Sequence, residues 1–147
     1  MPQSLAGVYL HIVFSTKNRA ALIAEDVQPH LHRYLGGIAN NLNCPIIRVG
    51  GTTDHVHILV RFGRTITIAD LVMKLKSSSS AWMKSHCQSF TWQSGYGVFS
   101  FGEERLSELI SYVENQAEHH RTVTFQEEFL GLLKEYDLAH DERYLWD

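Results

Sequence analysis

Residues 45–62 of this chain read PIIRVGGTTDHVHILVRF and hold two short apolar runs on either side of a glycine pair. Apolar runs of this length, rich in isoleucine and valine, are typical of β-strands. We therefore expect a strand over residues 45–49, a turn at Gly50-Gly51 and a second strand over residues 55–62. This strand pair is the centre from which the rest of the fold can be traced.

The sequence on both sides of the pair alternates between strand and helix patterns. Residues 8–15 alternate as a half-buried strand, and residues 90–101 predict an aromatic strand with a bend at its glycines. Helical spacing of apolar residues marks residues 26–41 and a longer helix that begins at the N-cap Thr67. The order strand, helix, strand, strand, helix, strand predicts an α+β, ferredoxin-like (split βαβ, or RRM-like) antiparallel sheet with helices on one face.

Two further helices are expected after the sheet, over residues 103–120 and 125–138. The chain has 147 residues, the size of one ordinary domain, so we expect a single domain over residues 1–147. Its hydrophobic content of 44% is globular, and no apolar run approaches the roughly 18 residues of a membrane span. The start of the chain lacks the pattern of a secretory signal, so we expect a cytoplasmic protein with reduced Cys44 and Cys87.

The net charge of -3 hides an uneven distribution of charge along the chain. Residues 1–101 hold 9 Lys and Arg against 4 Asp and Glu, whereas residues 102–147 hold 4 against 12. The basic part is suited to phosphate binding, although an acidic, solvated C-terminal helix would produce the same imbalance without any function. The candidate DNA-contacting residues are cations near strand ends and on the longest helix: Lys17, Arg19, Arg48, Arg61, Arg64, Lys74 and Lys76.

The strand over residues 55–62 carries His55 and His57 on one face, because side chains two residues apart on a strand point the same way. Two adjacent imidazoles can chelate one transition metal, and Asp54 beside them is either a supporting partner or only a residue that starts the strand. A His-x-His pair is also common as plain polar surface. The pair therefore does not identify a metal site without a second signal.

Tyr112 and Gln116 stand four residues apart on the predicted helix over residues 103–120 and so share a face. The phenol of Tyr112 has an ordinary pKa near 10 and needs a nearby cation or base to act as a nucleophile. A metal held by His55, His57 and the Gln116 amide would supply that cation and polarise a phosphate. A tyrosine at this position can equally lie over the core without a chemical role.

Four segments resemble the single-tyrosine transposases of the histidine-hydrophobic-histidine (HUH) endonuclease superfamily: residues 12–19, 55–57, 93–97 and 112–116. The resemblance covers nearly the whole chain and implies a small insertion-sequence transposase. Such an enzyme cleaves single-stranded DNA at hairpin-bearing element ends and transfers the strand through a 5'-phosphotyrosine intermediate.

Carried over residue by residue, the resemblance makes His55, His57 and Gln116 ligands of Mg²⁺ or Mn²⁺ and makes Tyr112 the nucleophile. It further implies a homodimer whose subunits share the active sites. In such a dimer the helix of one subunit that carries the tyrosine completes the metal site of the other.

Two alternatives stay open from the sequence. A domesticated transposase would use the sheet to bind single-stranded nucleic acid without cutting it, and the presence of all four candidate residues argues against this binding module. A metal-dependent hydrolase would use the histidine pair and a bound water. Its activity would survive Tyr112→Phe, and such sites commonly recruit a cluster of carboxylates that the sequence does not indicate.

Overall fold

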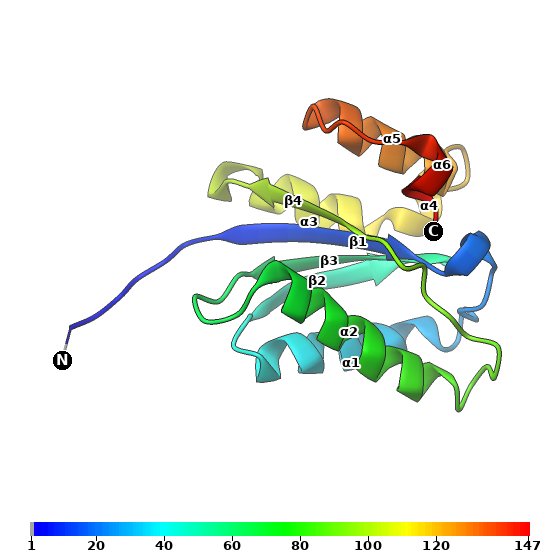
Figure 1. Ribbon diagram of the computed structural model, residues 1–147, viewed down its shortest axis with the longest axis horizontal. Coiled ribbons are helices and arrows are strands. Elements are labelled where there is room, and N and C mark those ends of the chain that lie inside the picture. Colours follow the sequence, from blue (N-terminus) through cyan, green and yellow to red (C-terminus); the bar gives the residue numbers. More distant parts are fainter. Residues whose placement is uncertain (1) are drawn as a thin grey trace.

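A four-stranded antiparallel sheet forms the centre of the protein in this computed structural model, which describes residues 2–147. The strands are β1 (Tyr9–Ser15), β2 (Ile46–Gly51), β3 (His55–Arg61) and β4 (Gly97–Phe101), in the spatial order β2-β3-β1-β4 (Figure 1). The two central strands pair so that Val13 lies opposite His57. The predicted α+β, ferredoxin-like class is confirmed, since strands and helices follow the split βαβ order.

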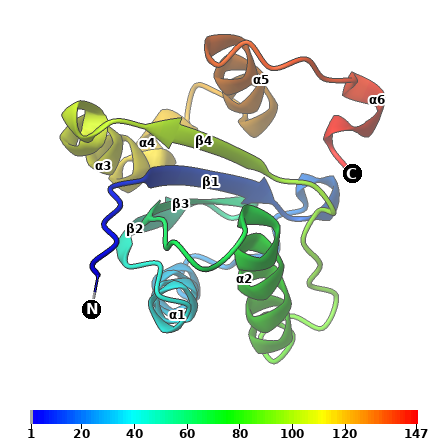
Figure 2. The ribbon, with the colours of Figure 1, turned by 60° about the vertical axis from the view of Figure 1, so that its left-hand side comes forward.

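Helices α1 (Gln28–Asn41) and α2 (Ile68–Met83) lie side by side against one face of the sheet (Figure 2). Alternate residues of the central strands, among them Ile12 and Ile58, are fully buried beneath these helices. Thr67 caps α2 as predicted, because its side chain accepts a hydrogen bond from the backbone N–H of Asp70 at 3.1 Å. This face supplies the largest hydrophobic core, and it leaves the opposite face of the same strands for the functional residues.

The opposite face is covered by the C-terminal part of the chain (Figure 1). Helix α3 (Leu106–Glu114) packs Leu109 and Val113 on the sheet, and α5 (Phe125–Glu135) packs Phe125 and Phe129 beside β4. The remaining short elements are the 3-10 helices η1 (Lys17–Arg19) and η2 (Glu103–Arg105) and the helices α4 (Gln116–His119) and α6 (Glu142–Leu145). None of the helices within residues 2–147 has the length and apolar composition needed to cross a membrane.

The predicted turn at Gly50-Gly51 is wrong, because both glycines belong to β2. A Cβ atom on Gly50 would lie 2.1 Å from the carbonyl oxygen of Val113 in α3, so the glycine allows the helix to approach the strand backbone closely. The actual turn between β2 and β3 is formed by residues 52–54. Gly50 is therefore required by the docking of α3, whereas Gly51 lies against the backbone of β3 next to the actual turn.

Three of the predicted elements are longer than those in the structure. The strand expected over residues 90–101 is confined to β4, and its first part forms only an isolated bridge between Trp92 and Thr16. The helix expected over residues 103–120 is divided at Asn115, whose φ of -100° and ψ of 24° are not helical. Helix α5 ends at Glu135, because Asp137 adopts a left-handed φ of 51° two residues later.

Candidate active site

His55 and His57 lie on the sheet face that is covered by the C-terminal helices, and both side chains are fully buried. Their rings are 5.1 Å apart between centroids, as expected for residues two apart on one strand. Close-packed strand partners on the other face fix the register, so neither histidine can turn to solvent. The predicted shared face is confirmed, but it is an interior face and not plain polar surface.

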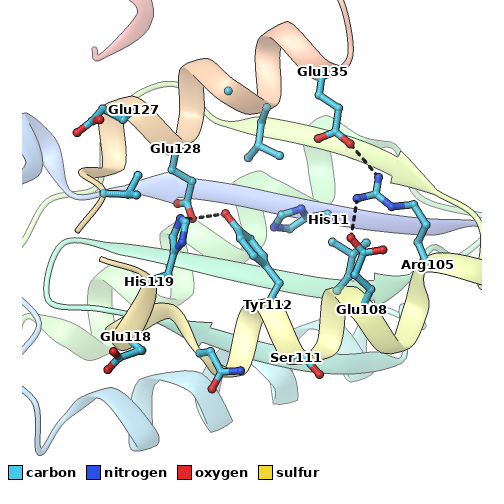
Figure 3. A pocket seen from close by; sticks show the side chains of 15 residues that line it. His11, Arg105, Glu108, Ser111, Tyr112, Glu118, His119, Glu127, Glu128 and Glu135 are labelled. Carbon is cyan, nitrogen blue, oxygen red and sulfur yellow. Dashed lines mark hydrogen bonds and ion pairs between the residues drawn. The ribbon is translucent and has the colours of Figure 1, made fainter. Parts of the chain in front are cut away.

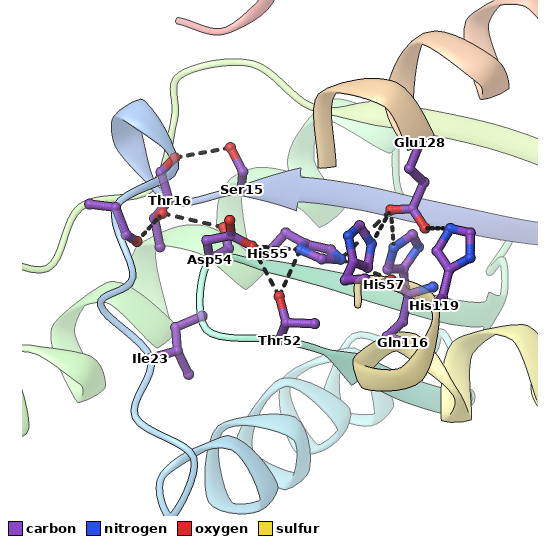
Figure 4. Close-up of polar contacts among 12 residues, drawn as sticks. Ser15, Thr16, Ile23, Thr52, Asp54, His55, His57, Gln116, His119 and Glu128 are labelled. Carbon is purple, nitrogen blue, oxygen red and sulfur yellow. Dashed lines mark hydrogen bonds and ion pairs between the residues drawn. The ribbon is translucent and has the colours of Figure 1, made fainter. Parts of the chain in front are cut away.

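Both nitrogens of the His55 ring have partners in the structure (Figure 4). Its Nδ1 lies 2.8 Å from Oδ1 of Asp54 and 3.0 Å from the hydroxyl of Thr52, which turns Nε2 towards Gln116. The distance from that Nε2 to Oε1 of Gln116 is 2.9 Å. Burial alone would raise the pKa of Asp54, but the contact with His55 holds the pKa below its usual value. Asp54 therefore occupies the supporting position that its sequence neighbourhood predicts.

His57 is contacted at both ring nitrogens as well. Its Nδ1 lies 2.7 Å from Nε2 of His11, a residue of β1, and its Nε2 lies 2.9 Å from Oε1 of Glu128 in α5. Burial lowers the pKa of His57 to about 4, even though the carboxylate of Glu128 acts in the opposite direction. The imidazole is therefore neutral at neutral pH, which is the form that binds metals.

Tyr112 reaches the same cluster from α3. Its hydroxyl donates a short hydrogen bond to Oε2 of Glu128, and its ring centroid lies 5.6 Å from that of His57. Burial and the negative charge of Glu128 raise the pKa of the phenol well above its ordinary value. Gln116 lies beyond the helix break, yet its amide still contacts the backbone carbonyl of Tyr112 at 3.3 Å. The predicted tyrosine and glutamine therefore do meet the histidine strand, although they belong to separate helices.

Glu128 and His120 are two members of the cluster that the sequence reasoning missed. The carboxylate of Glu128 is buried, and its Oε1 lies 3.1 Å from Nε2 of His120 and 3.7 Å from Nε2 of His55. Burial would raise the pKa of Glu128, but His120 and His57 outweigh it and hold the pKa far below the usual range. A signal was present, because Glu128 stands three residues after Phe125 and one before Phe129, within the buried stripe of α5.

The donor set fits a metal ion. The ligand atoms of His55, His57, His120 and Glu128 all lie within 4.8 Å of one another. Nε2 of His120 is buried and makes no hydrogen bond within residues 2–147, which is costly for a polar atom unless another group binds it. Neutral imidazoles and one carboxylate are ligands that suit divalent transition metals.

A cleft of about 680 Å³ between α3 and α5 leads from solvent to Tyr112 and Glu128 (Figure 3). Its rim is acidic, because Glu108, Glu118 and Glu135 line it together with one cation, Arg105. That cation is neutralised by an ion pair with Glu135 at 3.1 Å. The acidic charge of residues 102–147 is therefore concentrated in part around Tyr112, where it repels phosphates unless cations bind there.

Three of the predicted DNA-contacting cations are held by partners within the chain. Arg48 forms an ion pair with Glu114 at 2.8 Å, and Arg61 donates to the hydroxyl of Tyr9 at 2.9 Å. Lys76 donates to three backbone carbonyls in the loop before β4, at 2.6 to 3.1 Å, and burial lowers its pKa to about 8. The structure thus gives these three side chains a part in stabilising the fold.

The other four predicted DNA-contacting cations are placed differently. The guanidinium of Arg19 lies 5.4 Å from the centre of the Trp146 ring. Lys17, Arg64 and Lys74 are exposed. These three lie in η1, in the segment before α2 and in α2, so their contact with DNA stays a prediction.

The chain has relatives among known proteins. Residues 4–116 match the family model described as IS200-like transposase. Among solved structures, the chain is similar to a candidate transposase from Deinococcus radiodurans, with 23% identity and a TM-score of 0.64 over 79% of this chain and 95% of that one. It is also similar to a REP-associated tyrosine transposase bound to a REP hairpin, with 13% identity and a TM-score of 0.61 over 96% of this chain and 90% of that one. Among curated proteins, none matches.

The two structural likenesses show a shared fold, and the family match spans most of the chain. The matched residues include His55, His57 and Tyr112 and end at Gln116, so α5 with Glu128 lies beyond them. The resemblance to single-tyrosine transposases that the sequence predicts is confirmed. The chain belongs to the IS200-like transposase family.

Proposed function

We propose that this transposase cleaves single-stranded DNA at the hairpin-bearing ends of an insertion sequence and transfers the strand through a 5'-phosphotyrosine intermediate. Tyr112 is the nucleophile, and His55, His57 and Gln116 hold a divalent metal ion, Mg²⁺ or Mn²⁺. The observation that carries the proposal is the position of Tyr112. Its hydroxyl lies in the cluster that contains Nε2 of both histidines, with Glu128 bridging them.

The chemistry follows from the groups in the cluster. The oxygen of Tyr112 attacks a phosphorus atom as its proton passes to the carboxylate of Glu128, the P–O3' bond breaks, and the released 3'-oxygen takes up a proton to become a hydroxyl. The 5'-phosphate stays bound to the tyrosine, so the bond energy is kept for rejoining to another strand. A divalent ion at the histidine pair would supply the positive charge that polarises the scissile phosphate and favours the phenolate.

The residues of the chain set the starting state of this reaction. Because burial and Glu128 raise the pKa of Tyr112, the phenol keeps its proton and donates it to the Glu128 carboxylate as a hydrogen bond. Asp54 orients His55, and His11 orients His57, so that both Nε2 atoms face the cluster.

The proposed partner is single-stranded DNA that carries a hairpin, which is supported by the REP hairpin bound to the REP-associated relative. One chain brings Tyr112 and the histidine pair together, so a single subunit holds all four candidate residues. The homodimer with shared active sites stays a prediction. The activity of a mixture of Tyr112→Phe and His57→Ala chains tests it. If the active sites are shared, the mixed dimer would regain the activity that each variant alone lacks.

Covalent trapping tests the proposed reaction. The protein is incubated with Mn²⁺ or Mg²⁺ and hairpin-bearing single-stranded DNA from the flanks of its own coding region. We expect an adduct that resists denaturation, that disappears in Tyr112→Phe and that persists in Tyr9→Phe, a control on the same sheet face. Absence of the adduct in the wild type would support the alternative of a binding module without cleavage, and cleavage that survives in Tyr112→Phe would support a hydrolase.

A further inference from the structure

We infer that Glu128 and His120 are ligands of the same divalent ion as His55 and His57, so that the segment after the family match contributes to the metal centre. The inference deepens the proposed function and rests on it for the role of the ion in DNA cleavage. It adds an anionic ligand and a third imidazole to the neutral set of two histidines and Gln116.

The spacing of the donor atoms supports a common ion. In an octahedral site with bonds of about 2.1 Å, neighbouring ligand atoms lie about 3 Å apart. Oε1 of Glu128 lies 2.9 Å from Nε2 of His57, 3.1 Å from Nε2 of His120 and 3.7 Å from Nε2 of His55. Nε2 of His55 in turn lies 2.9 Å from Oε1 of Gln116. These separations are those of adjacent ligands around one centre.

The burial of Glu128 gives a second, independent reason. The ion-pair partners of its carboxylate among residues 2–147 are all histidines, and no lysine or arginine lies within 4.0 Å of it. A buried carboxylate without a permanent cation is costly, and a divalent ion at this place would neutralise it.

His120 gives the third reason. It follows α4 directly, and its ring lies 4.4 Å from the His55 ring between centroids. The buried Nε2 faces Glu128 at 3.1 Å but makes no hydrogen bond within the described residues. A buried ring nitrogen that makes no hydrogen bond and lies beside a carboxylate oxygen and two other imidazoles is the arrangement expected of a metal ligand.

Manganese binding to the full-length protein without DNA tests the inference. Isothermal titration with MnCl₂ compares the wild type with Glu128→Gln, which removes the negative charge, and His120→Phe, which keeps a ring but removes the donor nitrogen. We expect each variant to bind Mn²⁺ about 10- to 100-fold more weakly. Because imidazole ligands favour transition metals, we also expect the wild type to bind Mn²⁺ more tightly than Mg²⁺.

Matched controls come from the same part of the chain. Glu127→Gln changes the neighbouring glutamate of α5, which is exposed, and His140→Phe changes an exposed histidine. Both should bind Mn²⁺ as the wild type does. Wild-type affinity in both Glu128→Gln and His120→Phe would overturn the inference.

Hydrogen exchange of the wild type covers the case in which a variant does not fold. Mn²⁺ should slow amide exchange in α5 as well as in β3, because the ion would link the two elements through Glu128. Protection confined to β3 and α4 would contradict the inference. The two proposals can fail separately. Mn²⁺ binding that depends on Glu128, without any DNA adduct, would reject only the proposed function. A DNA adduct together with Mn²⁺ binding that does not depend on Glu128 would reject only the ligand assignment.

Discussion

His57 shows how much of this site depends on contacts from distant parts of the chain. Its ring lies between His11 of β1 and Glu128 of α5, which are 46 and 71 positions away in the sequence. When the proton of the His57 ring is on Nε2, this nitrogen can donate a hydrogen bond to Glu128. When the proton is on Nδ1, Nε2 is free to bind a metal. The His11 contact suits both tautomers, because the ring nitrogens of either histidine can donate or accept.

Because His32 in α1 is partly buried, we expect the stability of the fold to decrease in acid, independently of the candidate active site. Burial lowers its pKa to about 4 in the folded chain, against an ordinary value of 6.5, and its Nε2 makes no hydrogen bond within residues 2–147. The unfolded state therefore binds the proton more readily, so stability is full above pH 6.5 and falls as the pH is lowered towards 4. We expect His32→Phe to reduce the loss of unfolding free energy between pH 7 and pH 4 by about 2 kcal/mol.

Urea denaturation at a series of pH values measures this effect. His30→Asn is the matched control, because His30 is exposed on the same helix, and its pH dependence should equal that of the wild type. Part of the acid sensitivity should remain in His32→Phe, since burial also lowers the pKa of His11 and His57. An unchanged slope in His32→Phe would show that His32 does not titrate differently in the folded and unfolded states.

The sequence predicts individual site residues when their signal is local. His55 and His57 are separated by two positions on a strand, and Tyr112 and Gln116 by four positions near a helix, so both pairs follow from backbone geometry. Glu128 could not be placed in the same way, because an acidic residue in a helix is usually solvated. Its role depends on how α5 docks on the sheet, and that docking is a tertiary property.

At the scale of elements, the docking of α3 on β2 decides where Tyr112 lies. Gly50 permits it, because a Cβ at this position would approach the Val113 carbonyl oxygen to 2.1 Å, and Val113 follows Tyr112 directly. We expect Gly50→Ala to push α3 outwards and to cost about 1–3 kcal/mol of unfolding free energy. Displacement of Tyr112 by about 1 Å should slow adduct formation by about 100-fold.

The control for this variant is Gly37→Ala in α1. No atom lies within 4 Å of a Cβ built on Gly37, so alanine should be neutral or stabilising there, by up to about 1 kcal/mol. Urea denaturation and the rate of DNA adduct formation give the two readouts. Normal adduct formation in Gly50→Ala would show that α3 does not need this close contact to position the tyrosine.

The break between α3 and α4 could not be predicted from the spacing of apolar residues. Apolar spacing continues through residues 103–120, so the sequence indicates one helix, whereas the backbone leaves the helical region at Asn115. The break turns α4 so that Gln116 is buried against His55, with 1% of its surface exposed. The spacing of apolar residues does not predict this bend, which accompanies a tertiary contact between Gln116 and His55.

For the whole molecule, the uneven charge distribution predicts which part of the surface meets DNA. Lys17 and Arg64 are exposed in the basic part of the chain. We combine Lys17→Ala and Arg64→Ala each with Tyr112→Phe, so that DNA is bound but not cut. We expect each variant to bind hairpin-bearing DNA more weakly. The slope of log affinity against log salt concentration should fall by the amount that about one phosphate contact contributes. Fluorescence anisotropy across a range of salt concentrations measures both quantities.

Arg143 provides the comparison in the acidic part of the chain, where it forms an ion pair with Asp141 at 2.7 Å. Arg143→Ala should leave DNA affinity and its salt dependence unchanged. If it weakens binding as much as Lys17→Ala does, the acidic C-terminal part also contacts DNA and the charge argument is wrong.

The two faces of the sheet have separate hydrophobic cores, one beneath α1 and α2 and two smaller ones beneath α3 and α5. The histidine cluster lies between the smaller cores, so damage there removes few of the contacts that hold the first core together. In a library of all single substitutions, protein abundance should therefore be governed by the α1 and α2 face, while transposition should be lost on both faces. Copies of the gene inactivated at the histidine cluster would then still encode folded proteins, whereas copies inactivated on the α1 and α2 face would encode degraded ones.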